Sequence, residues 1–204
     1  GLKYGSVIVC TDQDHDGVGF IFPLLCNVLA VFWPNLLAAG YVKRWDTPRR
    51  RAVPKTRGQV IEFYDDAEFD EWCEVNPAAM SHYKIDYIKG LASHEPDVYD
   101  HMFKTFKQNI VTYNHDAYGE SRFEVMFGED TSKRKTWLAQ PSTSTATISK
   151  MVKSTRQDTT GNLIDCQGYE HAKSNIVQKL WSVIDGMNES GRKVLSGCLK
   201  AFKS

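Results

Sequence analysis

The sequence predicts an α/β fold, in which a parallel sheet is flanked by helices and followed by a helical C-terminal segment. A short β-branched run at residues 6–10 (SVIVC) precedes an acidic turn and then an uncharged, helix-forming stretch. A continuous apolar run of this length is typical of a strand that is buried on both faces. Strand, turn and helix in this order indicate the start of an α/β domain.

The first helix is expected to begin near Phe22, with Pro23 tolerated in its first turn, and to end before Pro34. Further strands are predicted over the short apolar segments 40–45, 59–64, 84–88 and 122–127. Because the first strand leads directly into this helix, the turn between them is expected at the carboxyl edge of the sheet.

Helix-capping residues place the next helices. Asp66 is expected to cap a helix that runs to about Val75, and Ser93 a helix from about 96 to 109. A further helix is predicted over 131–138. Trp72 and Trp137 lie in these amphipathic helices and are interpreted as core anchors.

The composition changes after residue 139. Residues 140–147 (QPSTSTAT) are small and polar, and we interpret them as a linker. Beyond them, apolar residues recur at helical spacing over 176–184 and again over 194–202. We therefore expect two helices, separated by a turn at 185–191.

Composition limits the function classes. Hydrophobic content of 42% and charged content of 25% are ordinary for a soluble globular protein, and 204 residues allow one or two domains. The formal net charge is zero, so DNA contact would require a local basic patch. The five cysteines are scattered without a C-x-x-C pair, which favours reduced thiols in an intracellular protein.

Residues 17–42 carry no charge and are long enough to suggest a membrane span. Two prolines, two asparagines and a glycine interrupt the stretch, so we expect a buried helix followed by a turn, and no membrane partner. No signal peptide is visible, and a first residue other than Met indicates that the sequence begins inside a longer reading frame.

The acidic turn, TDQDHDG, is the strongest chemical signal. Asp12, Asp14 and Asp16 alternate with other residues, and in an extended segment this spacing puts all three carboxylates on one face. Three close carboxylates repel one another unless a cation neutralises them. Their hard oxygens suit Mg²⁺ or Ca²⁺, and sites in α/β proteins lie at the carboxyl edge of the sheet.

Three simpler interpretations of the turn remain. An EF-hand loop also begins D-x-D-x-D-G, but its twelfth position would be Pro23 instead of the required Glu, and the preceding element is a strand. His15 alternates away from the acids and has no nearby Cys partner for zinc. The spacing by itself also fits a solvated turn.

The flanking segments make the pattern more specific. LKYGSVIVCTDQDHDG is followed in order by LLCNVLAVFWPNLL, YVKRWDTP, EFDEW, YIKGLAS, RKTWL and VIDGMNESGRKVL. Together they resemble the TOPRIM metal-binding region of type II DNA topoisomerases of eukaryotic or viral type, over most of the chain. The resemblance implies a Rossmann-like TOPRIM domain at 1–139 without its first strand, a linker at 140–168 and the start of a winged-helix breakage–reunion domain at 169–204.

The resemblance also implies roles for residues. Asp12 and Asp14 would ligate Mg²⁺, for which Mn²⁺ or Ca²⁺ could substitute, and Asp16 would support them or share a second metal. The metal would stabilise the DNA phosphate and the leaving 3′ oxygen while a tyrosine attacks. Lys89 would lie near the DNA backbone, and Arg192 and Lys193 would form the basic pair before a long helix.

A basic stretch between residues 43 and 57 includes Arg49, Arg50 and Arg51. A solvated loop is the simplest interpretation of such a run. Its position after the metal motif also makes it a candidate DNA-phosphate contact, whose removal would weaken binding uniformly and flatten the salt dependence.

Several family features are absent or altered. The catalytic Glu of the family would precede Gly1, and none of the nine tyrosines has the context of the attacking Tyr, which would follow Ser204. Val18 and Gly19 replace the usual Ser-His after the acidic motif, and Glu189 lies where the family has a Lys-Pro pair. By itself, this chain is therefore not expected to cleave or relax DNA.

The leading hypothesis is a fragment of an ATP-dependent type II topoisomerase that acts on double-stranded DNA. ATP would bind only to an ATPase domain outside this chain, and the whole enzyme would be a homodimer in the nucleus or, if viral, in the host nucleus or cytoplasm. The alternatives are another TOPRIM nuclease or primase and a non-catalytic DNA-binding remnant.

Overall fold

The computed structural model describes residues 2–88, 90, 95–140 and 145–202. The strands are β1 (Val7–Val9), β2 (Val42–Trp45), β3 (Arg50–Pro54), β4 (Ile61–Phe63), β5 (Tyr83–Tyr87), β6 (Ile110–Asn114) and β7 (Gln157–Thr159). The α-helices are α1 (Phe22–Phe32), α2 (Pro34–Ala38), α3 (Asp66–Val75), α4 (Ala79–His82), α5 (Pro96–Lys104), α6 (Ala117–Phe127), α7 (Thr131–Ala139), α8 (Thr145–Thr155), α9 (Thr160–Leu163), α10 (Tyr169–Lys179) and α11 (Glu189–Ala201). Two π-helical turns, η1 (Gly17–Ile21) and η3 (Ile164–Gly168), and a 3-10 turn, η2 (Phe106–Asn109), complete the described elements.

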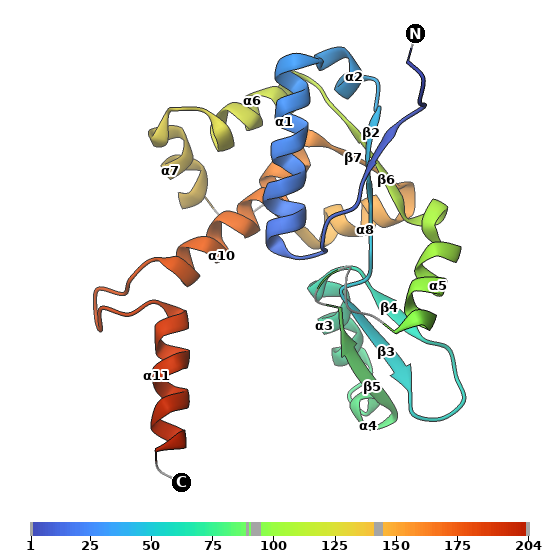
Figure 1. Cartoon of the computed structure of the whole chain (residues 1–204), viewed down its shortest axis with the longest axis vertical. Helices are drawn as coiled ribbons and strands as arrows, with labels where there is room; N and C mark the ends of the chain where they lie inside the picture. The colour runs from blue at the N-terminus through green and yellow to red at the C-terminus, as the bar shows by residue number, and fades with distance from the viewer. Residues whose placement is uncertain (1, 89, 91–94, 141–144, 203–204) are drawn as a thin grey trace.

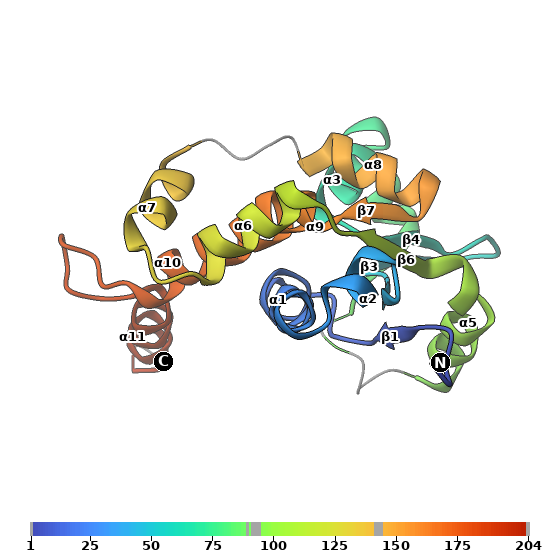
Figure 2. The same ribbon diagram turned by 90° about the horizontal axis from the view of Figure 1, so that it is seen from above.

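The larger sheet has four strands in the order β1-β2-β6-β7. β1 pairs with β2 in parallel, β2 with β6 antiparallel, and β6 with β7 in parallel. Helices flank this sheet, with α1 beside it and α6, α9 and α10 extending away (Figures 1 and 2). The predicted α/β class is confirmed, although the sheet mixes parallel and antiparallel pairs.

The main core lies between this sheet and its helices. It joins Phe22 and Cys26 of α1, Val111 and Tyr113 of β6, and Leu163 of α9, all of them buried. Residues that are far apart in the sequence therefore share one core. Trp137 of α7 is also buried in it, as predicted.

A second, smaller sheet has the order β4-β3-β5 and is antiparallel throughout. Its core consists of Ala52, Phe63 and Phe69, with Trp72 of α3 packed against them as predicted. The Asp65 side chain, not the expected Asp66, caps α3 by accepting a hydrogen bond from the Glu68 amide. This small unit lies below the larger sheet in Figure 1.

The C-terminal helix α11 stands away from the body (Figure 1), and none of its residues is buried. The predicted pair of C-terminal helices is confirmed, but α10 begins at Tyr169 and the chain leaves the helix at Leu180. In the described part of the chain, no helix is long and apolar enough to cross a membrane.

Two predictions about elements are wrong. Residues 122–127 belong to α6, not to a strand, because Asp116 caps the helix and the apolar residues Phe123 and Phe127 lie four positions apart. The expected linker at 140–168 is regular structure from residue 145 onward. It includes α8, β7 and the core residues Leu163 and Ile164, so this segment completes the sheet and the core.

Candidate metal centre

The acidic turn, residues 12–16, follows β1 at the carboxyl end of its parallel pairing with β2, where Val9 lies beside Arg44. Asp12 and Asp14 are exposed, and Gln13 between them is buried. The backbone at Asp16 is already helical (φ −74°, ψ −47°). The extended segment that was expected to align all three carboxylates therefore does not reach Asp16.

The three aspartates have different contacts. Asp14 Oδ1 accepts a hydrogen bond of 2.7 Å from the Gly17 amide and so helps to begin η1. Asp16 Oδ1 lies 3.1 Å from Nδ1 of His171, whose ring stacks on Phe20 with 5.0 Å between centroids. Asp16 thus joins the acidic turn to α10, although its side chain is 71% exposed.

Gly90, beyond the end of β5, lies close to the acidic turn. A Cβ atom on Gly90 would lie 3.1 Å from Asp12 Oδ1, so a side chain at this position would crowd the Asp12 carboxylate. Lys89, the predicted DNA contact, lies outside the described residues. Gly90, the described residue that follows it, lies next to Asp12.

The donor set fits Mg²⁺. Mg²⁺ is commonly held by one or two carboxylates and completes its octahedral shell with water and substrate phosphates, as Asp12 and Asp14 would allow. Across the described ranges, no three His, Cys, Asp or Glu side chains converge to hold a metal by themselves. The acidic turn is consequently suited to a metal shared with another ligand or with a phosphate.

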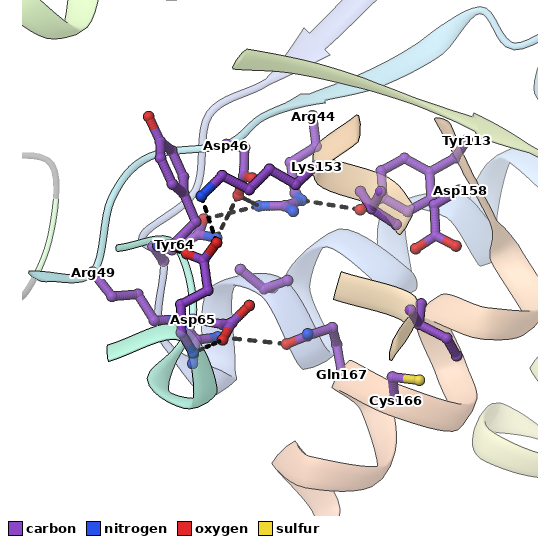
Figure 3. A pocket seen from close by; sticks show the side chains of 15 residues that line it. Arg44, Asp46, Arg49, Tyr64, Asp65, Tyr113, Lys153, Asp158, Cys166 and Gln167 are labelled. Carbon is purple, nitrogen blue, oxygen red and sulfur yellow. Dashed lines mark hydrogen bonds and ion pairs between the residues drawn. The ribbon is translucent and has the colours of Figure 1, made fainter. Parts of the chain in front are cut away.

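Gln13 points inward into a network of buried polar side chains, most of which are drawn in Figure 3. Its Nε2 donates to Asp46 Oδ1 at 2.5 Å, and its Oε1 accepts from Arg44 Nη1 at 2.8 Å. Arg44 Nη1 also lies 3.1 Å from Asp46 Oδ1, and Arg44 Nε donates to the hydroxyl of Tyr113 at 3.2 Å. Burial is the main cause that raises the pKa of Tyr113, so this hydroxyl is protonated at neutral pH.

The network borders a cavity of about 50 Å³, which also touches Arg49, Asp65, Lys153 and Asp158. A polar cavity of this size holds one or two water molecules but no organic ligand. Burial raises the pKa of Asp158, although the carboxylate accepts hydrogen bonds from Thr159 and Asn162. Gln13 of the acidic turn lines this cavity together with Arg44 and Asp46, so the residues around the cavity support the turn.

Arg49, Arg50 and Arg51 of the basic stretch are folded into the protein, whereas Lys55 and Arg57 lie in the exposed turn after β3. Arg50 and Arg51 lie in β3, where Arg50 Nη2 is 2.7 Å from Asp66 and Arg51 Nε is 3.5 Å from Glu62. Arg49 lies 3.5 Å from Asp66. The exposed fractions of the three side chains are 15%, 21% and 8% for Arg49, Arg50 and Arg51, so Arg49 and Arg50 are more accessible to solvent than Arg51.

The C-terminal basic pair is exposed and engaged in ion pairs. Arg192 contacts Asp185 through Nε at 2.6 Å and Nη2 at 2.9 Å, and Lys193 lies 2.6 Å from Glu189. Exposed ion pairs contribute little free energy, so a phosphate can replace these carboxylates. DNA contact by these residues stays a prediction.

The inward role of Gln13, Arg44 and Asp46 was not predicted. The alternation that exposes Asp12 and Asp14 also places Gln13 on the inner face, and Arg44 in β2 and Asp46 just beyond its end are two positions apart. These two regularities together could have indicated the contact. The sequence does not reveal that β2 lies next to β1, which is what brings them together.

A family model described as the C-terminal associated domain of TOPRIM matches residues 45–165. DNA topoisomerase 2 of African swine fever virus is 34% identical over all of this chain, which spans 17% of the viral protein. The mitochondrial DNA topoisomerase 2 of Dictyostelium discoideum is 26% identical over 98% of this chain and 15% of its own length.

Among solved structures, the DNA-binding, cleavage and re-ligation domain of Plasmodium falciparum topoisomerase II is similar, with a TM-score of 0.79 and 25% identity. The match covers 98% of this chain and 27% of that one. Sequence and structure thus agree on the same group of relatives. This chain spans only a small part of the length of each of them.

Proposed function

Because the chain belongs to the type II DNA topoisomerase family, in which it carries the C-terminal associated domain of TOPRIM, we propose that its acidic turn supplies Mg²⁺ ligands for DNA cleavage and religation. The observation that carries the proposal is the exposure of Asp12 and Asp14 at the carboxyl end of β1, with Gly90 against Asp12. These features leave room for a metal and a DNA phosphate beside the turn.

A bound Mg²⁺ would act there as a Lewis acid on the phosphate and on the leaving 3′ oxygen. The residues of this chain hold and orient it. Asp14 is fixed by its bond to the Gly17 amide, and Gln13 anchors the turn from inside. Asp16 contributes indirectly, by joining the turn to His171.

DNA would approach along the exposed carboxylates and contact basic groups nearby. Arg49 lines the same cavity as Gln13, Arg50 follows it at the start of β3, and Arg192 and Lys193 provide a separate exposed pair on α11; Lys89 remains a candidate from the sequence. Contacts of this kind to phosphates add affinity without sequence preference.

The whole enzyme would be an ATP-dependent homodimer that passes one duplex through another. Its ATPase domain, its attacking Tyr and its catalytic Glu would lie in parts of the polypeptide outside this chain. It would act in the nucleus, or in the host nucleus or cytoplasm if it is viral.

The test uses the complete polypeptide that contains this chain. We expect it to relax supercoiled DNA with ATP and Mg²⁺, and to form a covalent, EDTA-reversible cleavage complex. Asp12→Asn should reduce cleavage at least 100-fold, whereas Asp70→Asn, at an exposed position of α3, should leave it unchanged. Equal cleavage by both variants would overturn the proposal, and cleavage without religation would indicate a nuclease.

A further inference from the structure

We propose that Gln13, Arg44 and Asp46 form an amide clamp that positions Asp12 and Asp14 for the metal. The inference rests on the proposed metal site. It adds two positioning residues to that site, Arg44 in β2 and Asp46 just after the end of β2. It concerns side chains that do not touch the metal and act only through the backbone of the acidic turn.

Both polar ends of the Gln13 side chain are used. The amide nitrogen donates to Asp46 at 2.5 Å, and the amide oxygen accepts from Arg44 at 2.8 Å. An amide has separate donor and acceptor atoms, so it can donate to the carboxylate through nitrogen while it accepts from the guanidinium through oxygen. The two bonds therefore fix the orientation of the amide as well as its position.

The partners of Gln13 are themselves held in place. Arg44 is set by the parallel register of β1 and β2, in which it lies beside Val9, and by its bond to Tyr113. Asp46 is 7% exposed, its amide donates to the Asn109 carbonyl at 2.8 Å, and its Oδ2 lies 3.6 Å from Arg156. The clamp is consequently anchored to the sheet and cannot follow a movement of the turn.

Gln13 is 8% exposed and lies between the two exposed aspartates. Adjacent Cα atoms are about 3.8 Å apart, so a displaced Gln13 displaces both carboxylates. Metal sites commonly depend on such outer contacts, whose loss lowers metal affinity by about 10-fold to 100-fold. The clamp thus links sheet register to metal affinity.

The test measures Mn²⁺ binding to the whole chain from the electron paramagnetic resonance signal of free Mn²⁺, together with the midpoint of thermal unfolding. Gln13→Met removes both amide bonds at similar volume and leaves Arg44 and Asp46 paired with each other, so the variant should fold. We expect its Mn²⁺ affinity to fall about 10-fold.

An exchange of amide and carboxylate provides the rescue. Gln13→Glu by itself sets two carboxylates against each other, whereas Gln13→Glu with Asp46→Asn restores one acid and one amide across the same contact. We expect the double variant to bind Mn²⁺ within about threefold of wild type and the single variant to bind at least about 10-fold more weakly.

Asp165→Asn is the control for general destabilisation, because Asp165 pairs with Arg122 and accepts from the Trp137 indole, which are not residues of the clamp. It should lower the unfolding midpoint and leave Mn²⁺ affinity unchanged. Wild-type affinity in Gln13→Met, or equal affinity in the single and double exchange variants, would overturn the clamp. If the proposed metal site itself is wrong, the result is different: wild type then shows no Mn²⁺ binding that depends on Asp12 and Asp14.

Discussion

The indole of Trp137 donates a hydrogen bond of 3.1 Å to Asp165, and this contact ties α7 to the π-helical turn η3. The same carboxylate pairs with Arg122 and accepts from Tyr118, both on α6. One side chain thus connects α6, α7 and η3. Its position explains why the RKTWL segment belongs to the core of this domain.

Asp165→Asn should lower the free energy of unfolding by about 2–3 kcal/mol, because it leaves Arg122 without its carboxylate in a mostly buried cluster. Chemical denaturation measures the change. The matched control is Asp100→Asn, which removes an exposed ion pair with Lys104 and should cost less than about 0.5 kcal/mol. Equal effects of the two substitutions would contradict the role of Asp165.

Gly19→Ala should destabilise the contact between η1 and η3. Its Cβ would lie 2.3 Å from the Gln167 carbonyl oxygen and 2.7 Å from the Cβ of His171, and overpacking of this kind costs roughly 1–3 kcal/mol. Gly197→Ala is the control, since that Cβ meets nothing within 4 Å on the exposed helix α11. Alanine there should stabilise the helix by about 0.5–1 kcal/mol, and thermal unfolding should show opposite signs for the two variants.

Stability should fall as the pH is lowered below about 6.5, in part through His115. Burial is the main cause that lowers the pKa of His115 from 6.5, and the ring stacks on Phe123 while Nδ1 lies 2.8 Å from Thr160. Between the lowered pKa and 6.5 the unfolded chain binds more protons at this site, so its contribution to stability is present above this range and is lost below it. His115→Gln should show a flatter pH dependence of the free energy of unfolding, and an unchanged slope would speak against this assignment.

Native thiol labelling should separate the cysteines. Burial raises the pKa of Cys26 and of Cys166 to about 12, whereas Cys198 is exposed. Because the thiolate is the reactive form, iodoacetamide at pH 8 should label Cys198 and spare the two buried thiols. Mass spectrometry identifies the labelled sites, and unfolding in denaturant should make all five reactive.

The alternation and capping signals predicted much of the fold. The strand before the acidic turn, the helix from Phe22 and the helices of Trp72 and Trp137 depend on local patterns and lie where expected. Residues 122–127 alternate like a strand, yet a cap at Asp116 and long-range packing of Phe123 make them helical. β3 was missed because its arginines look solvated in sequence, while Glu62 and Asp66 from other elements neutralise them in the fold.

The candidate metal site could likewise be predicted only where it depends on local sequence patterns. Exposure of Asp12 and Asp14 follows from alternation, which is a local property. The contact of Asp16 with His171 and that of Gln13 with Arg44 and Asp46 depend on strand order and helix packing over 31 to 155 residues. No local pattern carries that information.

Isothermal titration of Mg²⁺ into wild type, Asp12→Asn, Asp14→Asn and Asp16→Asn tests the central claim most directly. We predict saturable Mg²⁺ binding that Asp12→Asn and Asp14→Asn each reduce at least about 10-fold, and that Asp16→Asn, whose carboxylate faces His171, changes much less. Binding of equal strength in wild type, Asp12→Asn and Asp14→Asn would contradict the assignment of the acidic turn as the metal site.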